Sequence, residues 1–384
     1  MLESVEWGEY RLGDLFEILS TKKKFDANKV IIGDKGHPYV VRTSQNNGIR
    51  GMIEADELYL NDGNTISFGQ DTATMYYQPM PYFTGDKIKV LRPKFEHFTS
   101  KSAQFFISCL QKPFMSFSWG ASSFSVETLE LQVMRLPTRE GKIDFEFMER
   151  FIAELNAARL AELNAYLTIT GLKDYSLTPE EEQALQCFES NHIEWSEFKM
   201  EKLFRRRDTK KLSYKAKELP KEPKGEYTLP CLTSSFLNQG LNYYAPRKDA
   251  SILKDVISIP SNSDVYRAYY QSRDFTVLSD AYAIEWEYGN IKISTKQYLF
   301  LVSSINQVTD LPIYSYKNKL GGWNVVKEKD ISLPTLDDEI DYALMENLIS
   351  AIQKLVIKDV VLYADREFEA TKRVIDNTSK RNSI

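Results

Sequence analysis

The sequence predicts an α+β fold in which a mixed α/β domain occurs twice, each copy followed by a long helix. Both copies open alike: Trp7-Gly-Glu-Tyr-Arg-Leu-Gly-Asp-Leu-Phe16 is matched by Trp195-Ser-Glu-Phe-Lys-Met-Glu-Lys-Leu-Phe204. Both also close alike, on Leu-Pro-Thr followed by Ile143-Asp-Phe-Glu-Phe-Met-Glu149 or Ile340-Asp-Tyr-Ala-Leu-Met-Glu346. Because the motifs keep their order, we expect two similar domains, which would suit a target with two halves.

Within each copy the elements are predicted from short apolar runs between turn residues. Such runs at 39–41 and 87–91, and at 255–259 and 282–286 in the second copy, are typical of strands. Each copy also contains one helical stretch, at 100–110 and 295–305. Each domain is therefore predicted to be mostly β with one helix.

Two long helices are predicted after the domains, over 143–168 and 340–375. Gly171 should end the first, and Thr178 should cap a further short helix whose first residue is proline. The apolar stripes of the long helices must be buried, and each is the obvious partner of the other. The predicted helix seam comprises Phe151, Leu155, Leu163, Leu348, Ile352, Leu355 and Leu362.

These elements predict four segments: a domain at 1–140, a central helical region at 141–192, a second domain at 193–336 and a final helix at 337–384. No apolar run approaches the roughly 18 residues of a membrane span, and the N-terminus lacks a secretory pattern. The three scattered cysteines, Cys109, Cys187 and Cys231, suit a reducing cytoplasm and argue against a disulfide framework or a zinc site.

The charge is unevenly distributed. The net charge is −5, yet residues 202–217 contain eight basic side chains and one acid. Acids concentrate elsewhere, for example at 180–182 and 337–339. A basic face on an acidic chain is compatible with DNA binding, and the acidic remainder could face a partner protein.

Motifs for catalysis are missing from the sequence. There is no Asn-Pro-Pro-Tyr motif, no glycine-rich phosphate loop and no His-Glu-x-x-His. Asp208-Thr-Lys210 and Glu222-Pro-Lys224 match the acid-x-Lys fragment of nuclease sites, which often occurs by chance, and the three histidines are isolated. We therefore expect no catalytic residues, no metal site and no cofactor in this chain.

Candidate DNA contacts occupy matching places in the two copies. Lysines follow the opening motif of each copy, where they could neutralise phosphates or simply belong to a solvated loop. Amide-rich loops come next, and their side chains could read base edges or only form turns. The basic candidates are Lys22, Lys23, Lys24, Arg205, Arg206, Arg207, Lys210 and Lys211, and the loop candidates are Arg42, Ser44, Gln45, Asn46, Asn47, Arg50, Thr233, Ser234, Asn238 and Gln239.

A third pair of matching segments, 70–78 and 262–271, ends on Tyr-Tyr-Gln in both copies. Each segment could be a packed strand or part of a DNA-binding face. This pair adds Gln70, Asn262 and Arg267 to the candidates. Lys317 and Lys319 follow Tyr314-Ser-Tyr316, which matches Phe117-Ser-Trp119 in the first copy.

The duplicated layout resembles the specificity (S) subunits of restriction-modification systems. The opening and closing motifs, together with Thr170-Gly-Leu-Lys-Asp-Tyr-Ser-Leu-Thr-Pro-Glu-Glu-Glu-Gln-Ala-Leu185, look most like the branch that serves two-subunit BcgI-like systems, which is related to Type I S subunits. The resemblance covers residues 1 to 376. Type I subunits typically carry a Pro-Leu-Pro where this chain has Leu-Pro-Thr.

The resemblance implies a non-enzymatic reader of double-stranded DNA, with two pseudo-symmetric target recognition domains joined by long antiparallel helices as a coiled coil. Each domain would read half of a bipartite target, and the differing loops imply that the halves differ. The helices would set the distance between the halves and dock an adenine-N6 methyltransferase or fused methyltransferase-nuclease. S-adenosylmethionine and magnesium would belong to that partner. A duplicated adaptor that binds only protein, and a nuclease using the acid-x-Lys fragments, remain rival interpretations.

Overall fold

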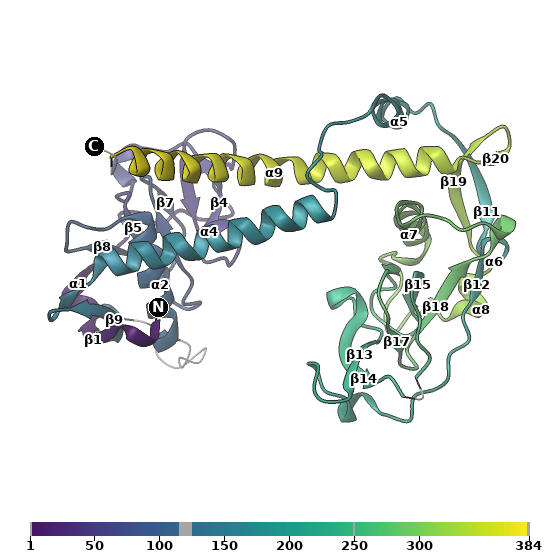
Figure 1. Ribbon diagram of the computed structural model, residues 1–384, viewed down its shortest axis with the longest axis horizontal. Coiled ribbons are helices and arrows are strands. Elements are labelled where there is room, and N and C mark those ends of the chain that lie inside the picture. Colours follow the sequence, from purple (N-terminus) through teal and green to yellow (C-terminus); the bar gives the residue numbers. More distant parts are fainter. Residues whose placement is uncertain (1, 115–124, 249, 382–384) are drawn as a thin grey trace. The chain divides into compact units, whose positions relative to one another are not determined.

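A computed structural model describes residues 2–114, 125–248 and 250–381 (Figure 1). The chain divides into two compact units, one made of residues 1–165 with 367–384 and the other of residues 166–366. Both units are mixed α/β, as the sequence predicts. The segment Phe117-Ser-Trp119 lies outside the described residues.

Unit 1 contains three small sheets with the strand orders β1-β9-β10, β2-β8-β5-β6 and β4-β3-β7. Helix α2 packs on β9 and β6. Its strands are β1 (Glu6–Arg11), β2 (Phe16–Ser20), β3 (His37–Val40), β4 (Ile49–Ile53), β5 (Thr65–Gly69), β6 (Met75–Gln78), β7 (Phe83–Thr84), β8 (Ile88–Pro93), β9 (Val133–Arg139) and β10 (Lys142–Ile143), and its helices are α1 (Leu12–Leu15), α2 (Ser100–Phe114), α3 (Val126–Glu130) and most of α4 (Phe145–Ile169).

Unit 2 repeats these sheets as β11-β19-β20, β12-β18-β15-β16 and β14-β13-β17, and helix α7 packs on β19 and β16. The internal repeat in the sequence is therefore a repeat of topology. Its strands are β11 (Glu194–Lys199), β12 (Phe204–Arg206), β13 (Tyr227–Leu232), β14 (Leu241–Pro246), β15 (Val256–Pro260), β16 (Tyr269–Gln271), β17 (Thr276–Val277), β18 (Ala281–Trp286), β19 (Asp330–Leu336) and β20 (Glu339–Ile340), and its helices are α5 (Pro179–Glu189), α6 (Met200–Leu203), α7 (Thr295–Thr309), α8 (Trp323–Val326) and most of α9 (Tyr342–Arg381).

The opening motif builds the core of each unit. Trp7 pairs with Pro137 across β1 and β9, and its ring stacks on Phe105 with the centroids 6.5 Å apart. In unit 2 Trp195 pairs with Pro334 and stacks on Phe300 at 6.3 Å. The Leu-Phe pairs that end the motifs are buried in both units. The apolar residues of the motif therefore contribute to the core of each unit.

The closing motif attaches each long helix to its unit. The carboxylate of Asp144 accepts a hydrogen bond from Phe147 N (2.9 Å), and that of Asp341 accepts one from Leu344 N (2.8 Å), so both cap a helix N-terminus. The following methionines, Met148 and Met345, are completely buried. Because these first turns belong to the cores, unit 1 extends beyond the boundary predicted at residue 140, to Ala165.

The predicted seam residues differ in burial. Leu348 is 3% exposed and packs in the core of unit 2, and Phe151 packs against the core of unit 1. Leu155, Ile352 and Leu355 keep 43%, 42% and 49% of their surface exposed, whereas Leu163 and Leu362 are half-buried. The pairing of α4 with α9 therefore stays a prediction.

The connection that follows α4 is attached to α9 inside unit 2. As predicted, Thr178 caps α5, and its capping box includes Glu181. The ammonium of Lys354 on α9 donates to Glu181 Oε2 and to Ser176 O, both at 2.8 Å. Lys173 pairs with Asp365 at 3.4 Å. The side chains of Glu181 and Lys354 are only 6% and 17% exposed, so this ion pair is largely buried.

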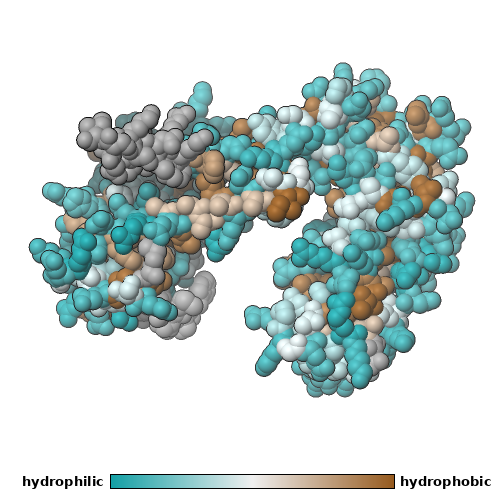
Figure 2. All heavy atoms as spheres, viewed as in Figure 1, coloured by the Kyte–Doolittle hydropathy of each residue, from teal (hydrophilic) through white to brown (hydrophobic). Residues whose placement is uncertain are grey.

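Across the described ranges, no helix combines the length and apolar character needed to cross a membrane. Figure 2 shows mostly hydrophilic side chains on the visible face of each unit, with scattered hydrophobic ones. The three cysteines are free thiols.

Candidate nucleic-acid interface

The amide-rich loops have the same backbone conformation in both units. Val41 N donates to Gly48 O (2.8 Å) in unit 1, and Thr233 N donates to Gly240 O (2.9 Å) in unit 2. Residues 42–47 therefore correspond one by one to residues 234–239. Two consecutive residues of each loop are left-handed: Asn46 and Asn47 have φ of 45° and 50°, and Asn238 and Gln239 have φ of 47° and 56°. Turn chemistry thus accounts for these amides at least in part, because asparagine tolerates this conformation.

A glutamine fastens each loop to its sheet. Gln78 Nε2 donates to Asn47 O and to Ser67 Oγ, both at 3.1 Å. In unit 2 Gln271 Nε2 donates to Gln239 O (3.2 Å) and Ser258 Oγ (3.0 Å). These are the glutamines of the shared Tyr-Tyr-Gln, which lies on β6 and β16. The packed-strand alternative is therefore correct for Gln78, which is 2% exposed.

Replacing Gln78 with alanine should destabilise unit 1 by about 1–3 kcal/mol, because it leaves the buried Ser67 hydroxyl and the Asn47 carbonyl with one partner fewer. The equivalent change at Gln271, which is half-buried, should cost less. Denaturant unfolding of the two variants gives the comparison, and equal losses would contradict it.

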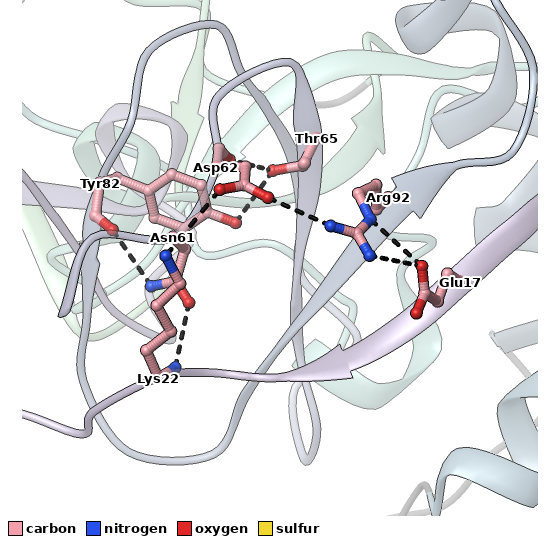
Figure 3. Close-up of polar contacts among 7 residues, drawn as sticks. All are labelled: Glu17, Lys22, Asn61, Asp62, Thr65, Tyr82 and Arg92. Carbon is pink, nitrogen blue, oxygen red and sulfur yellow. Dashed lines mark hydrogen bonds and ion pairs between the residues drawn. The ribbon is translucent and has the colours of Figure 1, made fainter. Parts of the chain in front are cut away.

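The lysine loop of unit 1 begins in a network of polar groups (Figure 3). Lys22 N donates to Asn61 Oδ1 at 3.2 Å, and Asn61 Nδ2 donates to Tyr82 O at 3.1 Å. The Lys22 ammonium lies 4.0 Å from Asp62, whose carboxylate also accepts from Arg92 at 3.3 Å. The backbone of Lys22 is thus fixed, whereas its side chain remains 52% exposed.

The three lysines of this loop have different surroundings. The Lys23 ammonium lies 4.2 Å from the ring centroid of Tyr59 and 4.9 Å from that of Phe25, a cation–π contact. Lys24 pairs with Asp86 at 3.5 Å, and both side chains are 59% exposed. Lys22 and Lys24 are therefore better placed than Lys23 for phosphate contacts.

A cavity of about 640 Å³ brings the lysine loop and the amide-rich loop of unit 1 together. Its lining comprises Lys24, Phe25, Asp26, Ala27, Tyr39, Val41, Arg42, Gly85 and Asp86. Lys24 was predicted as a phosphate contact and Arg42 as a base contact, and both lie on its wall. Ser44, Gln45, Asn46, Asn47 and Arg50 are exposed nearby in the sequence.

Arg42 is held by a carboxylate that the sequence did not single out. Its Nη1 donates to Asp71 Oδ2, and Lys87 Nζ donates to the same oxygen at 3.2 Å. Partial burial acts to raise the pKa of Asp71, but the hydrogen bonds and charges of Arg42 and Lys87 outweigh it and lower that pKa. Asp71 is therefore ionised at neutral pH. Gln70, its neighbour, is half-buried and engaged in an interaction of its own.

The basic stretch of unit 2 is partly neutralised from within. Arg205 and Arg207 both bind Glu285, at 2.6 and 2.8 Å, across the β12–β18 pair. The Arg206 guanidinium lies 5.6 Å from the ring of Tyr282. Lys210 and Lys211 follow this strand and are exposed, and Lys210 N donates to Ser251 Oγ at 2.8 Å. The two lysines are thus the more available cations.

The remaining candidates in unit 2 are spread over several loops. Arg267 pairs with Asp310 at 2.6 Å, and Lys319 lies 4.7 Å from the ring centroid of Tyr316. Lys317 is exposed, whereas Thr233, Ser234 and Asn262 are half-buried. Asp208, Lys210, Glu222 and Lys224 of the acid-x-Lys fragments are all exposed. Nowhere in the described ranges do three or more His, Cys, Asp or Glu side chains gather as metal ligands.

Comparisons with known proteins show similarity to restriction-modification specificity subunits. Residues 4–165 match the family described as "Type I restriction modification DNA specificity domain". The chain is 22% identical over 362 residues to the "Type II restriction enzyme BgcI specificity subunit S.BcgI" of Heyndrickxia coagulans, covering 92% of this chain and 96% of that protein.

Its fold is similar to that in the crystal structure of the Type I restriction-modification system S subunit from M. genitalium. The TM-score is 0.55 and the identity 14%, with 97% of this chain and 95% of that chain covered. Residues 4–165 therefore match the Type I restriction modification DNA specificity domain, and nearly the whole chain is similar in sequence to a restriction-modification specificity subunit.

Proposed function

We propose that this chain is the DNA recognition subunit of a restriction-modification system and performs no chemistry itself. The family of residues 4–165 supports this proposal, and so does the match of nearly the whole chain to an S subunit. The observation that carries it is the repeated amide-rich loop, which is fastened by a glutamine in each unit and, in unit 1, shares a cavity with a lysine loop. Fixed polar loops beside exposed cations suit base readout beside phosphate contacts.

The target is proposed to be bipartite and asymmetric, with one half read by each unit. The corresponding loop positions carry different chemistry: Arg42 is matched by Ser234, and Gln45 by Leu237. Arginine can donate to guanine and glutamine to adenine, whereas leucine can only make apolar contacts. Two loops of the same conformation with different side chains would therefore read different bases.

The long helices are proposed to pair antiparallel as a coiled coil, set the distance between half-sites and dock an adenine-N6 methyltransferase or a fused methyltransferase-nuclease. Exposed apolar side chains on α9, including Leu355, Val356, Val360 and Tyr363, support a surface that another element covers. S-adenosylmethionine and magnesium would be bound by the partner, and the complex would act in the cytoplasm.

Binding of a random-sequence duplex pool by the full chain, with and without its methyltransferase partner, tests this proposal. We expect salt-dependent binding to all duplexes and enrichment of a two-part sequence. An adaptor that binds only protein would enrich nothing, and a nuclease would cleave DNA without the partner.

Replacing both Lys22 and Lys24 with glutamine should weaken binding to all duplexes alike. The slope of log affinity against log salt should flatten by about 0.9 for each lost phosphate contact. Lys142→Gln removes an exposed lysine outside both loops and should leave the slope unchanged. A double variant with the original slope would exclude these two lysines as phosphate contacts.

A further inference from the structure

The Arg42–Asp71–Lys87 cluster is a charged group of unit 1 whose three positions carry different residues in unit 2. Backbone hydrogen bonds give its counterparts: Gln70 N donates to Lys87 O and Ser261 N to Asp280 O, both at 2.9 Å. Asp71 therefore corresponds to Asn262, Lys87 to Asp280 and, from the loop alignment, Arg42 to Ser234. Ser234, Asn262 and Asp280 therefore place no cation–carboxylate pair at the corresponding positions of unit 2.

The clamp of Arg42 on Asp71 leaves the Arg42 side chain 32% exposed. A guanidinium has five N–H donors in a rigid plane, and the contact with Asp71 Oδ2 uses Nη1. Guanine offers two acceptors, O6 and N7, at the spacing that arginine bridges in the major groove. Arg42 also lies on the wall of the cavity that includes the phosphate candidate Lys24. A cation held in this place can face a base while a neighbour faces the backbone.

Asp71 is built to hold a cation rather than to face solvent. Its side chain is 26% exposed, and its Oδ1 is buried without a hydrogen-bond partner among the described residues. Arginine pairs best with a carboxylate through two parallel hydrogen bonds. The free Oδ1 therefore allows Arg42 to take a two-point contact when its outer edge meets a ligand. Lys87 donates to the same Oδ2 as Arg42 and so helps to keep the carboxylate in place.

We infer that Arg42 reads a guanine in the half-site bound by unit 1 and that Asp71 is the positioning residue that orients it. This inference rests on the proposed function. It names the base that is recognised, the residue that reads it and the residue that positions the reader. It assigns guanine to one half-site only, because Ser234 and Asn262 replace Arg42 and Asp71 in unit 2.

The test uses the full chain with its methyltransferase partner and compares the duplexes enriched from a random pool. Arg42→Lys keeps the charge but cannot bridge O6 and N7 in the same way. It should lower the preference for one G·C pair by about 5- to 150-fold, while affinity for non-specific duplex stays unchanged. Asp71→Asn should also lower the preference for G·C at this base pair. Its affinity for non-specific duplex should not fall, because the variant has lost a negative charge.

Asp86→Asn is the matched control, because Asp86 lies on the same cavity wall and pairs with Lys24 instead of Arg42. Asp86→Asn should change the affinity for non-specific duplex in the same direction as Asp71→Asn. Unlike Asp71→Asn, it should leave the preference for every base pair unchanged. Asp71→Glu retains the carboxylate and should keep most of the guanine preference, which separates positioning from a loss of folding.

The outcomes distinguish the inference from the function on which it rests. A wild-type complex that enriches no sequence would refute the proposed function. Enrichment of a bipartite target, with the same preferences in wild type and Arg42→Lys, would overturn the guanine assignment alone. A changed preference in Arg42→Lys together with an unchanged one in Asp71→Asn would overturn the positioning role.

Discussion

Replacing Lys354 with alanine should lower the unfolding free energy of unit 2 by about 3–5 kcal/mol, the usual cost of leaving one member of a buried ion pair alone. Glu181 would keep the backbone donor of Thr178 at 2.8 Å but lose the one cation that pairs with it among the described residues. Ser176 O would lose a donor as well. Because Lys354 joins α9 to the connection between α4 and α5, amides of α5 should exchange faster with solvent.

Lys358→Ala is the matched control on the same helix. Lys358 is exposed and lies 6.0 Å from the ring centroid of Tyr175, so its loss should cost at most about 1 kcal/mol. Urea unfolding followed by hydrogen exchange of α5 distinguishes the two variants. Equal protection of α5 in both would mean that the Lys354–Glu181 pair does not hold this segment.

The contribution of the pair should depend on pH. Burial acts to raise the pKa of Glu181, but Lys354, Ser350 and the Thr178 backbone outweigh it and lower that pKa below the ordinary 4.5. A lowered carboxyl pKa stabilises the folded chain fully above the ordinary value and loses this effect as the pH falls through the folded value. The difference between wild type and Lys354→Ala should therefore be full at neutral pH and shrink below about pH 4.5.

The elements were predictable because the repeat supplies each pattern twice. The duplicated Ile-Asp and Met-Glu residues predicted where the two long helices begin. In the structure Asp144 and Asp341 cap α4 and α9. The lysines after the opening motif were expected in loops and follow β2 and β12. These features depend on residues that are close in the sequence, so they could be predicted from one amino-acid sequence.

The partners of the charged residues were not predictable, because they come from distant strands. Glu285 lies 80 residues after Arg205 in the chain and faces it only through the β12–β18 register. Asp71 is likewise far in sequence from Arg42, and Tyr59 from Lys23. The role of Gln78 could have been found, because Tyr-Tyr-Gln stands in both copies, but whether it faced the loop or solvent depended on strand pairing.

Exchanging the first recognition domain for that of a relative should replace one half of the methylated target and leave the other half unchanged. The structure indicates where to join the chains. Phe147, Met148 and Ile152 of α4 are in the core of unit 1, so a junction at residue 140 would pack native side chains on a foreign core. A junction after the exposed Leu155 keeps the whole core from one parent.

The chimera joined at 155 should fold as stably as its parents, and the one joined at 140 should be less stable with the same specificity. Each base pair that changes should weaken binding of the original target by about 5- to 150-fold, since a mismatch costs about 1–3 kcal/mol. Sequencing the duplexes that the chimera enriches from a random pool, together with the proposed methyltransferase partner, identifies both halves. A stable chimera whose target changes in both halves, or in neither, would show that the two units do not read DNA independently, whatever their shared topology.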